Sequence, residues 1–534
     1  MLSLWTKRVF WLSVGAMASV GFFYLLFLGR GFTYALDEWM FVARGTSWSK
    51  DTLLAPHNGH ISVLAAAIYV AVFRTFGLNH PEIFRVIVLV MQMGCAVCVG
   101  LLVSRRHGRS IAVWAGLLVM FLGKGAQNIV WGFQIGMTGS VLFFLVAMVL
   151  IDRWEVEPRR SRLILASIAL SASILLGSVG LPAIAAVTAY VLLSRRRGDV
   201  WWVPIPSVVV YAVWYTSYSV SLPVITKVGP AARWTWGASR DALAAFFDAG
   251  DVWGGVLASA LLTLMIHGAV RRTLPLRLVA WLTFVFVFWG LTSTARWFVP
   301  TDSPRYLHVA MIGLVMVVSD ACPDLRSRRS HNLPWYSAGT AVVVVVSIAL
   351  QFPTFRFENV MMRNYYSAAP SMRGTLGAIE LLGDNIDPSL PIVKFGDTSL
   401  ISVGEYMRAV RSARSSPAVS PLALATSPLP VRQGADFFLN MSRVVEVQPA
   451  TDTGCTAEPP RQSITISGGG SLRVRNVGAN GFVVRRFLST VPVGVTATEL
   501  PAGTSMIAVP IDDVTVPWVL VFSSPMEQLS CPTS

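Results

Sequence analysis

The chain has 534 residues, of which 54% are hydrophobic and 13% are charged, and its formal net charge is +15. A mean hydropathy of +0.59, with tryptophan recurring along the whole length, excludes an ordinary soluble domain. The positive charge is gathered in short clusters between apolar runs, such as residues 105–109, 159–162 and 195–197. Such clusters are typical of cytoplasmic loops rather than of a nucleic-acid-binding surface. We therefore interpret the chain as a multi-pass protein of a bacterial-type plasma membrane.

Apolar segments near the length of a bilayer span predict about eleven transmembrane helices, with the N-terminus in the cytoplasm. The spans are expected at 9–29, 83–103, 111–123, 133–151, 163–177, 181–193, 201–220, 252–270, 278–295, 306–320 and 336–352. The first is interpreted as a retained signal anchor, because no small-residue cleavage site precedes Gly29. If the apolar run 61–76 also crossed, the next basic loop would lie on the wrong side. We therefore expect it to be a helix in the external interface, within a first external loop over 30–82.

The last part of the chain has a different pattern. Hydrophobic residues alternate with a period of two at Ile464 and Ile466, Leu472 and Val474, Phe482 and Val484, and Val514 and Val516. Alternation bounded by turn residues predicts short β-strands. The sequence thus predicts an α-helical polytopic membrane domain over 1–355 and an extracytoplasmic β-rich domain over 356–534, with a helix around 376–382. Cys455 and Cys531 are the only cysteines in the latter, and an oxidising compartment would allow them to pair.

The first external loop holds a polar island, Asp37-Glu38-Trp39 followed by His57-Asn58-Gly59-His60. Ionisable side chains beside hydrocarbon are costly, so such a group predicts a site that handles protons or a cation. One interpretation is a divalent cation held by the two histidines with one of the acids. Another is that the histidines orient a substrate by hydrogen bonds. A purely structural alternative is that the two acids cap a short helix over 39–43.

Three cations in external loops, Lys124, Arg296 and Arg305, oppose the usual inside preference for positive charge. They contact either lipid headgroups or the phosphate of a lipid substrate, since arginine binds phosphate through two parallel hydrogen bonds. A carboxylate facing such cations suits glycosyl transfer from a lipid-phosphate sugar. The carboxylate takes the proton of the attacking hydroxyl, and the cations stabilise the departing phosphate.

Residues 35–44 resemble the Asp-Glu segment that follows the first span in glycosyltransferases of the C superfamily. The protein mannosyltransferase and lipid A aminoarabinose transferase branch is most similar. There, a His-Pro-Pro segment opens a helix that ends in Phe-Gly, and an arginine begins the next span. Here the residues 57–60 precede the run 61–76, Phe76-Gly77 ends it, and Arg85 begins the next span. The match covers roughly the first 110 residues, and Asn58 and Gly59 replace the prolines.

This resemblance implies a polyprenyl-phosphate sugar donor and an extracytoplasmic glycan, lipid or protein acceptor. Asp37 is the first choice for the general base and Glu38 the second. The candidate substrate-binding residues are His57, Asn58, His60, Lys124, Gln134, Arg296, Arg305 and Tyr306. No cofactor is expected apart from the divalent cation already considered, and no nucleic acid. The alternatives are a transporter or flippase for lipid-linked sugars and a non-catalytic envelope-assembly protein.

Overall fold

The computed structural model describes residues 2–218, 228–271, 274–296, 299–322, 333–366, 368–395, 398–478 and 480–531. Contacts divide the chain into two compact units. The first comprises Met1–Arg30, Ser47–Ala71 and Pro81–Arg363, and the second comprises Gly31–Thr46, Val72–His80 and Asn364–Ser534. Two pieces of the first loop therefore belong to the same unit as the C-terminal part. The predicted boundary between residues 355 and 356 stays a prediction.

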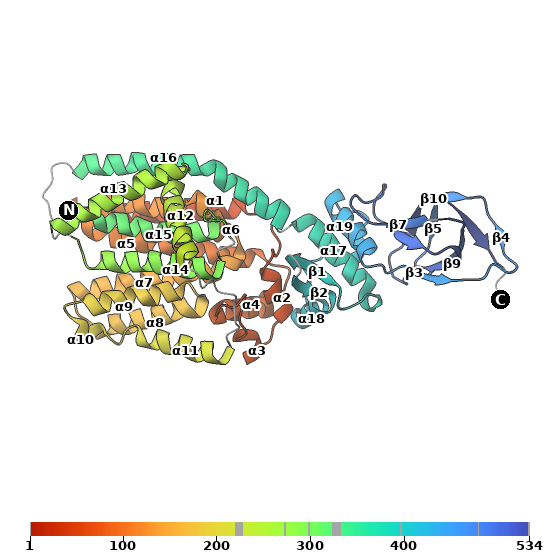
Figure 1. Cartoon of the computed structure of the whole chain (residues 1–534), viewed down its shortest axis with the longest axis horizontal. Helices are drawn as coiled ribbons and strands as arrows, with labels where there is room; N and C mark the ends of the chain where they lie inside the picture. Colours follow the sequence, from red (N-terminus) through yellow and green to blue (C-terminus); the bar gives the residue numbers. More distant parts are fainter. Residues whose placement is uncertain are drawn as a thin grey trace. The chain divides into compact units, whose positions relative to one another are not determined.

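The first unit is helical (Figure 1). Its longer helices are α1 (Leu2–Leu28), α5 (Glu82–Met120), α7 (Ile135–Val156), α8 (Arg160–Leu176), α9 (Gly180–Leu193), α11 (Ile205–Tyr218), α12 (Val228–Ala244), α13 (Asp251–Val270), α14 (Arg277–Arg296), α15 (Pro304–Ala321) and α16 (Leu333–Met361). Short helices are α3 (Lys50–Leu53), α6 (Ala126–Val130) and α10 (Arg197–Val200), and α4 (Val63–Phe76) begins in this unit. Within the described residues every predicted span overlaps a helix, and residues 219–220 of the span 201–220 lie outside them, whereas α12 was not predicted.

Length and composition identify five helical segments of the described chain that are able to cross a membrane. They are Glu82–Met120, Gly132–Val156, Asp251–Val270, Arg277–Ala295 and Trp335–Asn385. Shorter apolar helices occur at Ala18–Leu28, Val63–Phe76 and Gly180–Leu193. The protein is thus mostly helical with several candidate spans, as predicted. The total of eleven crossings and their orientation stay predictions.

Helix α5 contains two of the predicted spans, because it folds back on itself at Gly108. This glycine has φ +81°, a conformation that a side chain disfavours. The Nε2 amide of Gln92 donates to the carbonyl of Val119 at 2.6 Å. In a straight helix these residues would lie about 40 Å apart, at about 1.5 Å per residue. The two halves of α5 therefore form a hairpin.

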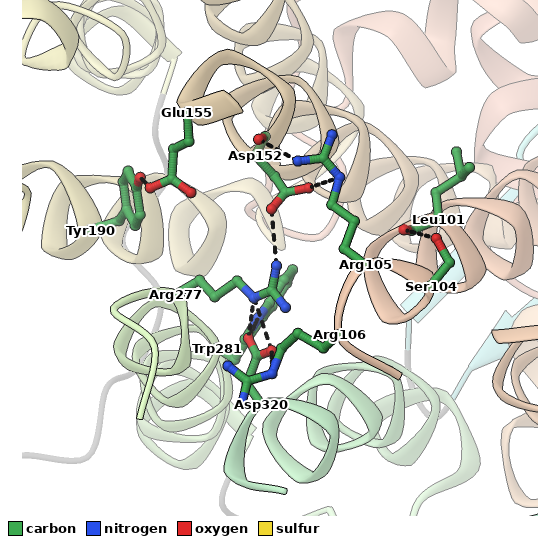
Figure 2. A network of polar contacts seen from close by, with 10 residues as sticks. All are labelled: Leu101, Ser104, Arg105, Arg106, Asp152, Glu155, Tyr190, Arg277, Trp281 and Asp320. Atoms are coloured by element: carbon green, nitrogen blue, oxygen red, sulfur yellow. Dashed lines mark hydrogen bonds and ion pairs between the residues drawn. The ribbon is translucent and has the colours of Figure 1, made fainter. Parts of the chain in front are cut away.

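A network of buried ion pairs joins the end of this hairpin to three other helices (Figure 2). Arg277 of α14 lies between two carboxylates, with Nη1 2.9 Å from Asp152 of α7 and Nε 2.8 Å from Asp320 of α15. The indole N–H of Trp281 also donates to Asp320, at 3.0 Å. Asp320 has no exposed side-chain surface. Its charge is therefore held by donors rather than by water, as a buried carboxylate requires.

The basic residues before Gly108 take part in the same network. Arg105 Nε lies 2.8 Å from Asp152, and Arg106 donates to the carbonyl of Cys322 at 2.9 Å while its Nε lies 3.9 Å from Asp320. His107 donates from Nε2 to the carbonyl of Ser319 at 2.8 Å. This cluster was expected to be a topology signal. In the structure it also attaches the hairpin to α7 and α15.

The second unit contains helices and strands. Its helices are α2 (Glu38–Arg44), α17 (Ala369–Leu382), α18 (Val403–Ala413) and α19 (Leu429–Met441). Its strands are β1 (Pro391–Phe395), β2 (Thr398–Ser402), β3 (Glu446–Pro449), β4 (Thr456–Ala457), β5 (Arg461–Ile466), β6 (Ser471–Asn476), β7 (Asn480–Arg485), β8 (Thr498–Leu500), β9 (Gly503–Ala508) and β10 (Trp518–Ser530). The predicted C-terminal β-rich domain and the helix around 376–382 are confirmed.

The long strand β10 organises the larger sheet. Its first half, residues 518–522, pairs antiparallel with β5 and β7, and its last residues pair with β6 and β4. Strand β6 continues to β9 and β3, and β7 continues to β8. Strand β10 thus belongs to two groups of strands, with its exposed residues 523–525 between them.

Three of the four predicted strands are confirmed, and the fourth is wrong. Val514 and Val516 lie in the segment before β10 rather than in a strand. The N–H of Val514 bonds the carboxylate of Asp512, and both valine carbonyls accept from Arg486. Side chains therefore satisfy backbone groups that a strand would have used in a ladder.

The helices of this unit pack closely and are tied to the strands. A Cβ on Gly374 would meet the carbonyl of Val431 at 1.8 Å, so α17 and α19 approach to a distance that only glycine permits. Asp436 of α19 is fully buried and accepts the N–H groups of Arg486, Phe487 and Leu488. Burial raises the pKa of the Asp436 carboxyl, and these N–H groups oppose the shift.

We predict that removing the charge of Asp320 destabilises the first unit. In D320N, Arg277 and Arg106 lose a buried anionic partner, which costs about 3–5 kcal/mol. The matched control is R109Q, since Arg109 belongs to the same basic cluster but is exposed. The melting temperature of the purified protein should fall for D320N and stay unchanged for R109Q. Equal melting temperatures would contradict the structural role of the network.

A disulfide joins Cys455 to Cys531, across 76 residues, whereas Cys95, Cys98 and Cys322 are free. We predict that protein purified from membranes carries Cys455 and Cys531 as a disulfide-linked peptide, because the expected compartment is oxidising. Mass spectrometry after alkylation checks this, with Cys322 as the thiol that should be modified. Breaking the bond should cost about 2–5 kcal/mol. Free thiols at both positions would contradict the external placement of this domain.

Candidate functional site

The acidic pair of the first loop begins helix α2, and its two members have different environments. Glu38 is buried, and its Oε2 accepts the N–H of Ala35 at 3.0 Å. The N–H of Glu38 in turn donates to the carbonyl of Ala35, and Leu36 between them has φ +45°. Asp37 occupies the N-cap position but forms no side-chain cap bond, and it is only partly buried. A purely structural role at the start of the helix therefore fits Glu38, whose side chain holds the turn, better than it fits Asp37.

Helix α2 is supported by elements of its own unit. It packs against β2 and α18. Leu78 of the first loop donates its N–H to the hydroxyl of Ser415, and the hydroxyl of Tyr34 donates to the carbonyl of Leu78, both within the second unit. From α18, Tyr406 donates to Glu380 of α17 at 2.7 Å, and burial, with this carboxylate, raises the pKa of the Tyr406 phenol. The candidate base Asp37 therefore belongs to the second unit, together with the C-terminal part of the chain.

The cation nearest to the acids in sequence on this helix is Arg44. Its guanidinium lies 5.3 Å from the centre of the Phe41 ring, and burial lowers the pKa of Arg44. An arginine starts from so high a value that it keeps its charge. The helix thus carries a positive charge at its C-terminal end, where the helix dipole favours one.

The four residues His57-Asn58-Gly59-His60 form a β-turn rather than the start of a helix. His57 and His60 exchange backbone hydrogen bonds of 2.9 Å in both directions. Asn58 and Gly59 have φ +50° and +77°, the left-handed pair that Asn-Gly favours in type I′ turns. Helix α4 begins only at Val63. The two histidines therefore do not lie on one helical turn.

The turn places His57 against aromatic residues of the same unit. The ring of His57 is buried and lies 5.1 Å from that of Phe133, which lies 4.9 Å from Trp131. Asn58 is exposed. Within the described residues, no group of three or more His, Cys, Asp or Glu side chains is arranged to hold a metal ion. The contact division assigns this turn to the first unit and Asp37 to the second, so their association stays a prediction.

Of the three predicted external cations, Lys124 has an acidic partner. Its Nζ lies 2.5 Å from Asp248, and its backbone N–H donates to the side chain of Gln351. This ion pair neutralises Lys124 and makes it the weaker candidate for phosphate. Arg296 ends helix α14, and its side chain lies outside the described residues.

Arg305 remains as the available cation at the start of α15. It is partly exposed, and its guanidinium lies 5.4 Å from the ring centre of the buried Tyr306. Among the residues that the structure describes, the Arg305 guanidinium forms no ion pair or hydrogen bond. The predicted pair Arg305-Tyr306 therefore combines an unneutralised cation with an aromatic ring at a helix start.

The first unit also contains buried polar residues, of which only Gln134 was predicted as a site residue. Gln92, Asn128, Gln134 and His308 are fully buried. Asn128 donates to the carbonyl of Arg305 at 2.9 Å. Within the described chain, both amide atoms of Gln134 and the Oδ1 of Asn128 are buried without a hydrogen-bond partner. Uncharged polar residues in apolar runs were the available signal, but their partners are far apart in sequence.

Comparison with known proteins gave one kind of match. No family model and no curated protein matches this chain. The chain is similar to the crystal structure of ArnT from Cupriavidus metallidurans bound to undecaprenyl phosphate, with 14% sequence identity, 76% of this chain and 88% of that chain covered, and a TM-score of 0.44.

Proposed function

We propose that this protein is a membrane glycosyltransferase that moves a sugar from a polyprenyl-phosphate donor to an extracytoplasmic acceptor, with Asp37 as general base. The acceptor hydroxyl gives its proton to Asp37 as its oxygen attacks the anomeric carbon. The bond from that carbon to the phosphate oxygen breaks, and the polyprenyl phosphate leaves with the electron pair. Arg305 stabilises the negative charge that gathers on this phosphate.

The observation that carries the proposal is the different use of the two acids. The carboxylate of Glu38 is buried and holds the N–H of Ala35, so its geometry is committed to the turn. Asp37 precedes α2, is partly exposed, and is not used as a helix cap. A general base must reach the proton that it accepts, so exposure favours Asp37. This is why Asp37 stays the first choice and Glu38 the second.

Arg305 supports the donor class. A partly exposed guanidinium at the first turn of an apolar helix has no carboxylate partner within the described chain. A guanidinium binds phosphate through two parallel N–H donors. The apolar helices of the first unit suit a donor whose other end is a long polyprenyl chain. Tyr306 and Gln134 stay candidates for contacts to the sugar, and His57, Asn58 and His60 for contacts that orient donor or acceptor.

The second unit is proposed to hold the acceptor. Its support is that residues 31–46, which include the candidate base, share one compact unit with residues 364–534. Helix α2 packs there against α18 and β2. An acceptor bound by this unit would therefore be held by the same body that carries Asp37. Precise placement of a nucleophile and its base contributes strongly to catalysis.

We predict that D37N abolishes transfer while E38Q preserves most of it. Both changes remove one carboxylate and keep the shape of the side chain. The Gln oxygen in E38Q still accepts the N–H of Ala35, whereas Asn at position 37 cannot take a proton. The rate of sugar transfer from a labelled polyprenyl-phosphate donor should fall about 10²–10⁴-fold in D37N, at unchanged expression.

The two variants also identify the other outcomes. If E38Q loses transfer and D37N keeps it, Glu38 is the base and the assignment is reversed. If both variants keep full transfer, neither acid is the base. A chain that moves the lipid-linked sugar across the membrane without cleaving it, in wild type and both variants, would be a flippase instead.

A further inference from the structure

We infer that Asn128 and His308 are positioning residues for Arg305, acting through a buried hydrogen-bond relay that ends on the Arg305 backbone. The relay joins α5, α6 and α15 of the first unit. The inference rests on the proposed function, because it gives Arg305 the role of binding the donor phosphate. Asn128 and His308 lie outside the first-loop motif. In this proposal they act on Arg305 and do not contact the donor.

The relay has four successive hydrogen bonds. Asn128 Nδ2 donates to the carbonyl of Arg305 at 2.9 Å and lies 3.3 Å from Nδ1 of His308. Nε2 of His308 lies 2.9 Å from Oε1 of Gln92. Nε2 of Gln92 donates to the carbonyl of Val119 at 2.6 Å. The relay therefore runs from the second half of the α5 hairpin to the first turn of α15.

One arrangement of protons satisfies all of these contacts. The amide of Asn128 has two N–H donors, one for the Arg305 carbonyl and one for Nδ1 of His308. Nδ1 must then accept, so the ring proton lies on Nε2 and is donated to Oε1 of Gln92. The Gln92 amide donates onward to Val119. His308 is thus assigned as the neutral imidazole protonated on Nε2, a choice made from the bonding pattern.

The side chains of the relay are buried, and a glycine in the neighbouring backbone leaves room for the His308 ring. Gln92, Asn128 and His308 have no exposed surface. A Cβ on Gly125 would lie 2.7 Å from Cβ and Cδ2 of His308, so only glycine leaves room for the ring. A buried donor or acceptor that loses its partner costs about 1–3 kcal/mol, which holds each member in place. The segment Gly123–Asn128 is therefore a clamp on α15.

The end of the relay is what gives it a functional role. The carbonyl of Arg305, the second residue of α15, accepts from Asn128. Fixing this peptide fixes the direction in which the Arg305 side chain leaves the backbone. A guanidinium binds phosphate well only when its N–H groups face the oxygens, so a small rotation of the peptide weakens binding. The relay thereby orients the cation without contacting the lipid.

The test is a double-mutant cycle read by binding of undecaprenyl phosphate to the purified full-length protein in detergent. R305Q should raise the dissociation constant about tenfold, which is the effect of losing one charge-assisted contact. N128L keeps the shape of the side chain but loses both N–H donors, and it should raise the dissociation constant about fivefold. In the R305Q background, N128L should have no further effect, because its influence passes through Arg305.

A matched pair at position 308 gives a second measurement. In H308N the side-chain oxygen can replace Nδ1 as the acceptor for Asn128, whereas H308L offers none. Binding should stay near wild type in H308N and fall in H308L. If N128L or H308L fails to fold, G125A displaces the ring of His308 and takes its place. The control is S140A, since Ser140 is equally buried but donates to Ser173 in α8 and should leave binding unchanged.

The possible results separate the two proposals. If R305Q binds undecaprenyl phosphate as wild type does, the donor-phosphate role of Arg305 fails. If R305Q weakens binding but N128L does not, or if the effect of N128L is the same in both backgrounds, the positioning role is overturned. A loss of binding in S140A as large as in N128L would show that any buried polar change has this effect, and would overturn it too.

Discussion

The helical unit depends on the pairing of two buried carboxylates, Asp152 and Asp320, with arginine side chains. A charge among apolar helices must be matched by donors, since the surrounding medium solvates it poorly. Arg277 lies between both carboxylates, and Arg105 and Arg106 bring the α5 hairpin to them. Four helix segments far apart in sequence are thereby fixed at one end. The relay that reaches Arg305 joins α5 and α15 again, so both ends of these helices are held.

The elements that sequence predicts well are those that one physical requirement determines. A membrane helix must be apolar along its length, so the predicted spans coincide with helices, including the break between α8 and α9. A strand with one buried face must alternate, so the pairs Ile464 and Ile466 and Phe482 and Val484 lie in β5 and β7, all buried. In each case the signal lies within the segment itself. The partner segment is not needed to read it.

The features that sequence could not give depend on partners distant in the chain. Helix α12 lacks a long apolar run because Trp, Arg and Gly interrupt it, so hydropathy did not indicate a helix. The basic residues 105–107 looked like topology signals because their partners, Asp152 and Asp320, stand far along the sequence. The turn at Asn58-Gly59 carried a local signal, the Asn-Gly pair, but the resemblance to a helix-opening segment outweighed it.

The candidate site combines these two kinds of information. The sequence of the first loop was enough to single out the acidic pair. The structure distinguished its two members, because the Glu38 carboxylate accepts the N–H of Ala35 in the turn. Arg305 was predicted as a phosphate ligand from its position, and the ion pair of Lys124 with Asp248 makes Lys124 the weaker candidate. The proposed roles thus belong to one acid of the second unit and one arginine of the first.

The proposed function requires that the protein cleaves a polyprenyl-phosphate sugar and transfers the sugar to an acceptor. The most direct measurement is to incubate the purified wild-type chain, reconstituted in lipid, with a panel of polyprenyl-phosphate sugars and an envelope extract, and to quantify free polyprenyl phosphate and new glycoside. We expect one donor to be consumed, with both products in equal amounts. Consumption of no donor in the panel, or movement of the intact lipid-linked sugar across the membrane, would contradict the proposed transfer activity.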